Sequence, residues 1–447
     1  MKKNEYAEVL ITDMNDLGYG VGRVDNKVVF LPDAVTGEKL RVKIIKDAGS
    51  YFVARREELL EVSEKRAPSL CPAFPRCGGC AFCHIKREYE LELKRNFVES
   101  FLKKEGLKDA RVLPVKAVGG ETGWRNKIQY PARDGQLGYY APHSHRVIPN
   151  DGCILHHPAA EPVLRGVADF LFRSGVSSYD EETGKGLLRH LCLRTNADAS
   201  EMMLILVLNG EKLFCAGALC AFLREKYPDV KSVYLNVQKK NTNVIYGEKF
   251  ILLDGKETIT DELLGCSFEL SPASFYQVNH DACELLYKEV IARADLRGGE
   301  RVVDLFCGVG TIGICLCKHA PVGHLVGVEI VPQAVENARR NAERNGIQNA
   351  GFVCGDANHP ALKNADVVIV DPPRKGLDEA LIAQLSSLET LQKIVYVSCG
   401  PDTLARDLAH FSARGWTFGE LQPVDMFPKT GHVETVVLMT RTGTEKG

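Results

Sequence analysis

The sequence lacks long apolar runs. No window of its 447 residues approaches the roughly eighteen consecutive apolar residues that a membrane-spanning helix needs. The opening Met1-Lys2-Lys3-Asn4 has no apolar stretch behind its basic residues, which a secretion signal would have. We therefore expect a soluble, cytoplasmic protein without a membrane partner.

An excess of charge is missing as well. The chain carries 56 basic and 58 acidic residues, so any surface for a polyanion has to be a local patch. Internal repeats and low-complexity stretches are absent, which argues against a repeat architecture. With 45% hydrophobic and 26% charged residues the chain is typical of a globular protein, and its length predicts two to four domains.

Cysteine, in contrast, is plentiful, with 15 residues. Without a secretion signal these thiols are expected to be mostly reduced. Clustered cysteines then indicate a metal site or catalysis, whereas the scattered Cys192, Cys215 and Cys220 are expected to be small core residues.

Short apolar runs separated by glycine-bearing turns fill residues 1–62 and predict a small OB-like β-barrel. The glycines of Leu17-Gly18-Tyr19-Gly20-Val21-Gly22 fit a tight connection with positive φ. This segment is similar to the TRAM domain, and the resemblance implies RNA binding. A barrel with a purely structural role is the alternative.

Residues 63–275 mix strands and helices and predict a central α+β region. Arg87 to Phe97 has apolar residues near helical spacing, and its many charges are expected to lie on a solvated face. The continuous apolar run Met202 to Leu208 predicts a buried strand.

Residues 276–447 alternate apolar strands with helices, a pattern that predicts a doubly wound α/β domain. The candidate parallel strands are Val302–Leu305, Leu325–Val328, Val367–Val370 and Ile394–Val397. In such a domain the ligand binds at the carboxyl ends of the strands.

Acidic residues mark four strand ends, three of them on the strands above and one, Asp356, on a further strand that lies third in chain order. Asp304 precedes a glycine-rich turn containing Gly308, which lacks the G-x-G-x-x-G order of dinucleotide enzymes. Glu329 can accept hydrogen bonds from both hydroxyls of a ribose. Asp356 is expected at a place where its side chain could contact an adenine ring, and Asp371 follows the fourth strand. This pattern resembles the class I, Rossmann-like methyltransferases, and the resemblance implies S-adenosylmethionine as the methyl donor.

A cysteine, Cys399, follows the fifth strand and is predicted at the rim of the sheet beside the donor. Amides of a helix beginning after Pro401 are expected to lower the pKa of its thiol, which suits a nucleophile. Glu434, ahead of a final apolar strand, is the candidate base, and His432 is the second candidate.

Three segments together closely resemble the RNA uracil-5 methyltransferase family, and the likeness spans nearly the whole chain. They are Asp371-Pro372-Pro373-Arg374, Ser398-Cys399-Gly400 and His432-Val433-Glu434-Thr435. The resemblance implies that Cys399 adds to carbon 6 of uracil and that Glu434 accepts the proton of carbon 5. It also implies donor contacts from Gln277, Phe306, Glu329 and Asp371. The residues alone give no reason to choose Gln277 or Phe306.

Three further cysteines, Cys71, Cys77 and Cys80, form a C-x5-C-x2-C cluster. From spacing, the fourth ligand is either Cys83 or Cys153, and the site could hold zinc or an iron–sulfur cluster. The family resemblance selects Cys153 and a [4Fe–4S] cluster, although Cys83 stands where the family usually has glutamine. The spacing C-x3-C-x2-C that is typical of radical enzymes is absent.

Basic and aromatic residues alternate in the same region, a combination suited to phosphate contact and base stacking. They include Arg76, Lys86, Trp124, Arg125, Lys127, Tyr130, Arg133, Tyr139, Tyr140 and Arg146. We expect this region to hold RNA, with the target uridine flipped out or in a loop.

Barrel and cysteine cluster together resemble the 23S ribosomal RNA branch of the family, which predicts a monomer acting on 23S rRNA, without a DNA partner. A transfer RNA uridine-5 methyltransferase is one alternative, and a non-catalytic iron–sulfur RNA-binding protein is another. Arg374 argues against cytosine-5 and amino-group methyltransferases, since the former resemble one another in a cysteine at that place and the latter in an aromatic residue.

Overall fold

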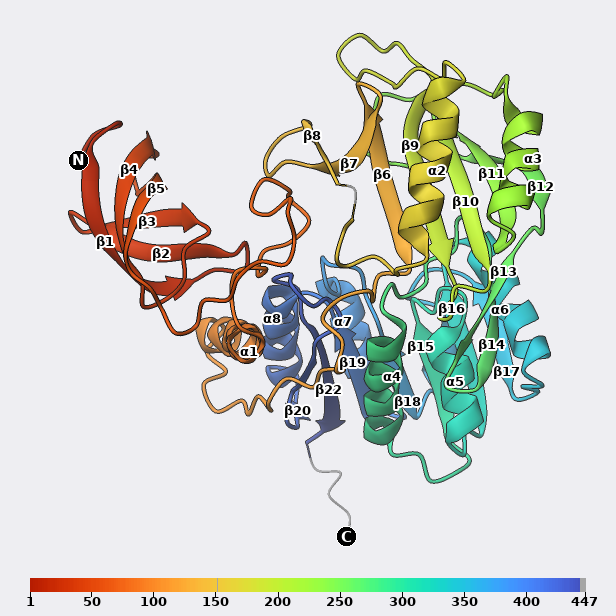
Figure 1. The fold of residues 1–447 in the computed structure, drawn as a ribbon. Coiled ribbons are helices and arrows are strands. Elements are labelled where there is room, and N and C mark those ends of the chain that lie inside the picture. Colours follow the sequence, from red (N-terminus) through yellow and green to blue (C-terminus); the bar gives the residue numbers. More distant parts are fainter. Residues whose placement is uncertain (151, 443–447) are drawn as a thin grey trace.

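The N-terminal residues form a closed five-stranded barrel in the computed structural model, which describes residues 1–150 and 152–442 (Figure 1). Its strands are β1 (Tyr6–Met14), β2 (Tyr19–Val24), β3 (Lys27–Pro32), β4 (Lys39–Asp47) and β5 (Tyr51–Glu61). Alternate side chains such as Val9, Ile11 and Leu31 fill the barrel. The predicted OB-like barrel is confirmed.

Helix α1 (Arg87–Lys104) follows the barrel and packs against α8 (Pro401–Ser412) of the C-terminal part. The prediction that its charges are all solvated is wrong: Glu90 and Lys94 are completely buried. They are buried because the face that carries them lies against the C-terminal part, where Lys94 Nζ donates a hydrogen bond to Asp425 Oδ1 at 2.6 Å.

The central part is a seven-stranded sheet in the order β12-β11-β10-β9-β6-β7-β8. Its elements are β6 (Lys127–Arg133), β7 (Gln136–Tyr140), β8 (Val147–Pro149), α2 (Ala160–Arg173), β9 (Leu188–Thr195), β10 (Met202–Leu208), α3 (Ala216–Lys226), β11 (Val230–Val237) and β12 (Lys249–Gly255). All seven residues of β10 are buried, as predicted. Helices α2 and α3 cover one face of the sheet (Figure 1), and Met203 and Ile205 on the other face join the core of the C-terminal part.

The C-terminal sheet has the order β17-β16-β15-β18-β19-β22-β20, with β21 paired to β22. Its strands are β15 (Arg301–Leu305), β16 (His324–Glu329), β17 (Ala350–Cys354), β18 (Val367–Val370), β19 (Lys393–Ser398), β20 (Trp416–Phe418), β21 (Gln422–Val424) and β22 (Glu434–Arg441). The first five strands are parallel and β22 is antiparallel to β19. All four predicted strands are present, so the doubly wound domain is confirmed.

Helices connect the parallel strands and cover the sheet. They are α4 (His280–Ala294), α5 (Thr311–His319), α6 (Pro332–Arg344), α7 (Glu379–Ser387), α8 and the short 3-10 helix η1 (Pro360–Asn364); the hairpin β13 (Ile259–Leu263) with β14 (Cys266–Leu270) precedes α4. No helix in the two described ranges is long and apolar enough to cross a membrane.

The boundaries predicted after residues 62 and 275 stay predictions. Within the central segment, the stretch after α1 runs along the C-terminal sheet, where Leu113 N donates to Leu421 O and Lys116 N to Pro423 O, both at 2.9 Å. Part of the predicted central region is therefore built into the C-terminal domain.

Backbone segments of all three parts meet without space between them. A Cβ atom at Gly18 in the β1–β2 turn would lie 2.0 Å from Ala81 O, and one at Gly431 would lie 1.8 Å from Asp16 O. Ala81 N in turn donates a hydrogen bond to Lys429 O at 2.9 Å. The barrel is thus docked directly on the loop that precedes β22.

Gly18 and Gly49 offer a matched test of this junction. Both have positive φ, +78° and +83°, so alanine at either position strains the backbone by about 1–2 kcal/mol. At Gly49, however, nothing lies within 4 Å of the added Cβ. We expect Gly18→Ala to lower the melting temperature more than Gly49→Ala and to speed proteolysis between barrel and centre. Equal effects of the two variants would contradict a tight junction.

Candidate active site

The carboxyl edge of the parallel strands collects the acidic residues that the sequence singles out. Asp304 is the second-last residue of β15, Glu329 ends β16, and Asp371 directly follows β18. Because neighbouring parallel strands end at one edge, these carboxylates converge on a single site. Asp356 lies two residues beyond β17, is exposed, and accepts a hydrogen bond from Asn358 N at 3.0 Å.

The glycine-rich turn after β15 presents its backbone to this site. Phe306, Gly308 and Gly310 all have positive φ, which coils the turn tightly ahead of α5. Gly308 N donates to Glu329 Oε2 at 3.1 Å, and Val331 N donates to Glu329 Oε1 at 2.9 Å. The carboxylate of Glu329 is therefore oriented by backbone amides, with lone pairs left for the hydroxyls of a nucleoside.

Asp304 is fully buried beneath the turn. Its Oδ2 accepts a hydrogen bond from Gly313 N at 3.1 Å, while its Oδ1 has no partner among the described residues. Burial, followed by the charge of Asp371, raises the pKa of Asp304 to about 8. A buried carboxyl with a free oxygen at this edge is suited to a polar or cationic ligand group.

Gln277 comes from the segment ahead of α4 and is 8% exposed. Asn126 from the central part holds this segment: its Nδ2 donates to Gln277 O at 3.1 Å, and its backbone N donates to Val278 O at 2.9 Å. No periodicity in the sequence marks this inter-domain contact, which is why residue-level reasoning could not find Gln277.

Cys399 and Glu434 face each other across the end of a β-ladder. Ser398 of β19 pairs with Thr435 of β22 in antiparallel register, so the next residues outward are Cys399 and Glu434. Glu434 is 4% exposed and Cys399 is half-buried. The two sequence-predicted catalytic residues thus lie together beside Asp371.

The electrostatics of this pair differ from expectation. The predicted lowering of the Cys399 pKa by helix amides is wrong, because burial and then the charges of Glu434 and Asp371 raise it to about 11. Arg374 acts in the opposite direction. Burial raises the pKa of Asp371, and burial together with the charge of Asp371 raises the pKa of Glu434 to about 8.

His432, the second candidate base, lies on the solvent side of this group. Its Nε2 is 3.2 Å from Arg374 Nη2, and its pKa is lowered by burial and by the charge of Arg374. Both side chains line a large cleft.

The cleft lies where the three parts meet. Its lining includes Tyr19 of the barrel, Gly78 and Gly79 of the cysteine loop, Trp124, Arg125 and His143 of the centre, and Arg374, Phe427 and His432 of the catalytic part. The ring of Phe427 makes edge contacts with Trp124 and with His432, at centroid distances of 6.2 and 6.1 Å. Tyr19 Oη and His143 Nε2 are 3.1 Å apart. Aromatic rings and guanidinium groups around one opening are suited to an unpaired nucleotide.

Some residues predicted to stack on RNA lie in the interior instead. Tyr130 is 2% exposed. Tyr139 lines the cavity beside the cysteines, and its hydroxyl lies 2.8 Å from His156 Nε2. Both rings pack on one another, so they belong to the structure of the central part and do not offer a free face for a base.

Four cysteines line a small cavity: Cys71, Cys77, Cys80 and Cys153. Cys83 lies outside this lining, and its thiol interacts with that of Cys80. Asn150 also lines the cavity, is 5% exposed, and finds no described partner for its amide oxygen or nitrogen. This donor set fits a thiolate-bound group. Within residues 1–150 and 152–442, however, no three metal-ligating side chains are placed to hold a metal ion.

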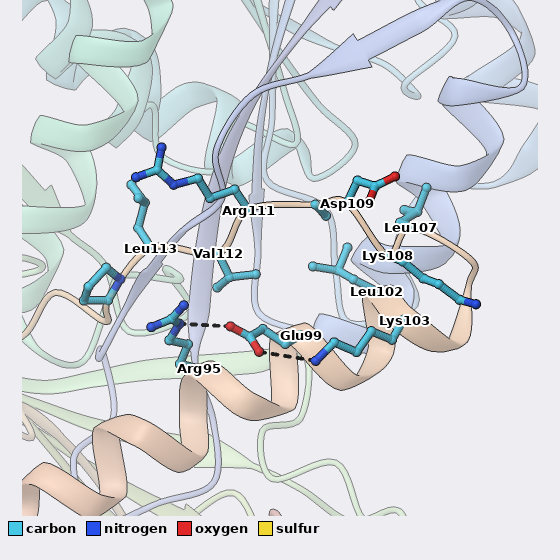
Figure 2. A pocket seen from close by; sticks show the side chains of 12 residues that line it. Arg95, Glu99, Leu102, Lys103, Leu107, Lys108, Asp109, Arg111, Val112 and Leu113 are labelled. Atoms are coloured by element: carbon cyan, nitrogen blue, oxygen red, sulfur yellow. Dashed lines mark ion pairs between the residues drawn. The ribbon is translucent and has the colours of Figure 1, made fainter.

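A second hollow lies away from this edge, between α1 and the chain that follows it (Figure 2). Three of its charged side chains form ion pairs: Arg95 Nε lies 3.0 Å from Glu99 Oε1, and Lys103 Nζ lies 3.6 Å from Glu99 Oε2. None of the sequence-predicted site residues lines it, so it is not a candidate active site.

Comparison with known proteins agrees with this arrangement. Residues 2–55 match the TRAM domain family, residues 296–400 match a methyltransferase domain family, and residues 361–442 match the tRNA (uracil-5-)-methyltransferase family. An uncharacterized RNA methyltransferase of Halalkalibacterium halodurans is 39% identical over 450 residues, which cover 98% of each chain. One of Clostridium acetobutylicum is 38% identical over 454 residues, covering 99% of this chain and 98% of that one.

Among solved structures, the tRNA (uracil-54, C5)-methyltransferase of Pyrococcus abyssi in complex with S-adenosyl-L-homocysteine matches with a TM-score of 0.80. It is 28% identical, and the match covers 97% of this chain and 99% of that one. The chain aligns with its relatives over nearly the whole given sequence, and it combines a TRAM barrel with a uracil-5 methyltransferase domain. The chain belongs to the S-adenosylmethionine-dependent RNA uracil-5 methyltransferase family.

Proposed function

We propose that the protein methylates carbon 5 of a uridine in 23S ribosomal RNA through a covalent bond between Cys399 and the base. The observation that carries this proposal is the pairing of Cys399 with the buried Glu434 at the donor edge of the sheet. A nucleophile and a base on opposite sides of one small space are what a two-stage substitution on a pyrimidine needs.

In the first stage the Cys399 thiolate adds to carbon 6 of uracil, and the electrons of the carbon 5–carbon 6 double bond move onto the ring as an enolate. Carbon 5 then takes a methyl group, which bound S-adenosylmethionine would supply in electrophilic form, with the electron pair of the broken sulfur–methyl bond staying on the sulfur of the departing S-adenosylhomocysteine. Arg374 supports this stage, because its positive charge lowers the pKa of Cys399 against the carboxylates around it.

In the second stage carbon 5 carries both the new methyl group and its original proton. Glu434 accepts that proton, the double bond reforms, and the bond between carbon 6 and the Cys399 sulfur breaks. Burial supports this role, since a carboxylate whose pKa is raised toward neutrality is a stronger base than a solvated one.

Glu329 and the amides of the Phe306–Gly310 turn would hold the nucleoside part of the donor, with Asp356 nearer the adenine. Asp304, Asp371 and Gln277 lie where the methionyl end would be, close to the reacting sulfur. The edge of the sheet at which Asp304, Glu329 and Asp371 gather supports this assignment, and the cleft lined by Arg374 and His432 is then available for RNA.

Transfer RNA is the second candidate substrate, and a specific observation favours it. The Pyrococcus abyssi enzyme, which is named for tRNA, matches 97% of this chain, so the barrel alone does not separate the two substrates. The cavity with four cysteines supports the ribosomal branch, which the sequence resembles in this feature.

We also propose that Cys71, Cys77, Cys80 and Cys153 bind a [4Fe–4S] cluster. Four buried or half-buried thiols around one cavity support this, as does the unpaired amide of Asn150, because such amides donate hydrogen bonds to cluster sulfurs. A cluster spreads its four ligands over four irons, whereas zinc needs all of them about 2.3 Å from one ion. Both groups take four thiolates, so the metal content of the purified protein separates them.

The function is tested with methyl-labelled donor and two unmodified transcripts, one of 23S rRNA and one of tRNA. We expect label in 5-methyluridine of the ribosomal transcript, none with Cys399→Ala, and an RNA–protein adduct that survives denaturation with Glu434→Gln, because elimination is blocked. Preferred methylation of the tRNA transcript would reverse the substrate assignment. Label in another nucleoside, or full activity of Cys399→Ala, would overturn the mechanism.

The cluster proposal assigns different roles to Cys153 and Cys83. We expect Cys153→Ala to lose iron and acid-labile sulfide on anaerobic purification, whereas Cys83→Ala keeps both, because only Cys153 lines the cavity. Iron and sulfide are measured per chain. Loss in Cys83→Ala with retention in Cys153→Ala would exchange the fourth ligand, and zinc in place of iron would reject the cluster.

The raised pKa of Cys399 predicts how its reactivity depends on pH. Below a pKa of about 11 the thiol is protonated, so alkylation by iodoacetamide without RNA should rise about tenfold per pH unit from 7 to 10. Glu434→Gln removes a negative charge beside the thiol and should increase the rate at pH 9. Peptide mass spectrometry measures the alkylation of Cys399, with alkylation of the exposed Cys354 as the reference. A rate that levels off near pH 7 would contradict the raised pKa.

A further inference from the structure

The loop between β21 and β22, residues 425–433, leads directly into Glu434. It also supplies Phe427 and His432 to the lining of the cleft. Val424, the residue before the loop, pairs with Glu434 itself across the β21–β22 ladder. Any displacement of this loop therefore moves the candidate base and the wall of the cleft together.

A single ammonium group from α1 holds the start of the loop. Lys94 Nζ donates to Asp425 Oδ1 at 2.6 Å, to Glu90 Oε1 at 2.9 Å and to Phe427 O at 3.0 Å. Lys94, Glu90 and Asp425 are all completely buried. Lysine has three donors, so every N–H of this group is used, and two of the three bonds reach the loop.

The same helix face holds the middle of the loop. Lys429 N donates to Glu90 Oε1 at 2.7 Å, and Lys429 has a positive φ of 67°, a conformation that lysine rarely adopts. Arg87 forms a further ion pair with Asp425. Glu90 thus links the ammonium of Lys94 with the strained backbone of the loop.

Charge balance in this cluster depends on Lys94. Three cations, Lys94, Arg87 and Lys429, pair with three carboxylates, Glu90, Asp425 and Glu121. Without the ammonium of Lys94, two cations remain for three carboxylates, and a buried charge that is not fully compensated is destabilising. Asp425 and Phe427 would also lose the donor that ties them to α1, so the loop would move away from this helix. Val424, the residue before Asp425, pairs with Glu434 in the β21–β22 ladder, so Glu434 would move with the loop.

We propose that Lys94 is a positioning residue for the elimination stage of methyl transfer, although it lies outside the catalytic site. This inference rests on the proposed function. Cys399 follows β19 and does not belong to the loop, so the nucleophile keeps its place when the loop moves. At saturating RNA, addition and methyl transfer are therefore affected less than proton removal, because Glu434 is the residue that directly follows the loop.

The test is single-turnover methylation of 23S rRNA transcript by full-length Lys94→Met, with the RNA–protein adduct and free 5-methyluridine RNA followed over time. We expect adduct formation within about threefold of the unsubstituted protein and release slowed about 10- to 100-fold, since misplacement of about 1 Å can cost this much. Lys94→Met with Asp425→Asn removes one charge of each sign and should restore most of the release rate.

Leu171→Ala is the matched control, because it opens a cavity in the core of the central part, far from the loop, and lowers stability without touching this charge cluster. It should lower the melting temperature and leave the ratio of adduct to product unchanged. If Lys94→Met does not fold, Asp425→Asn keeps the size of the side chain and weakens the same bond, and the same partial block of release is expected.

Two results would overturn the positioning role: equal slowing of adduct formation and release in Lys94→Met, or the same accumulation of adduct in Leu171→Ala. Failure of the proposed function is distinguishable from both. In that case neither the unsubstituted protein nor Glu434→Gln forms any adduct with RNA.

Discussion

The antiparallel pairing of β22 with β19 is the contact on which the site depends. Parallel strands alone bring Asp304, Glu329 and Asp371 to one edge, and that edge is a place for a nucleoside ligand. Only the reversed strand β22 adds a residue that points back toward the end of β19. Because Ser398 pairs with Thr435, the thiol of Cys399 and the carboxyl of Glu434 meet at this same edge. The acidic strand ends and the candidate catalytic pair thus come from one sheet.

Burial gives these groups their chemical character. Solvated carboxylates would be charged and weakly basic, whereas Asp371 and Glu434 are placed where ionisation is costly, and their pKa values rise. The same burial raises the pKa of Cys399, the candidate nucleophile. Arg374 is the neighbouring cation whose charge favours the thiolate, and it also lines the cleft.

Much of this could be predicted from the sequence, because apolar runs and acidic strand ends are local signals. The barrel, β10, the four parallel strands and the residues at their ends all follow from short windows. What could not be predicted depends on contacts between distant segments. Local helix polarity suggested a lowered pKa for Cys399, but the carboxylates opposite it come from other strands. Likewise, Lys94 has the spacing of a solvated helix residue, and only its packing on Asp425 shows that it is buried.

The bond between Lys94 and Asp425 joins positions 331 residues apart, so it also bears on the order of assembly. During synthesis α1 emerges long before Asp425, with charged side chains that water can solvate until this partner arrives. The partner is synthesised only after the barrel, the central sheet and strands β15 to β19. The loop of residues 425–433 needs both Lys94 and Asp425, so it cannot take its final shape before both have been synthesised. Contacts between residues so distant in sequence also form slowly. The barrel and the central sheet precede Asp425 in the chain and can fold beforehand, whereas the pairing of Cys399 with Glu434 is completed only after the loop of residues 425–433 has been synthesised.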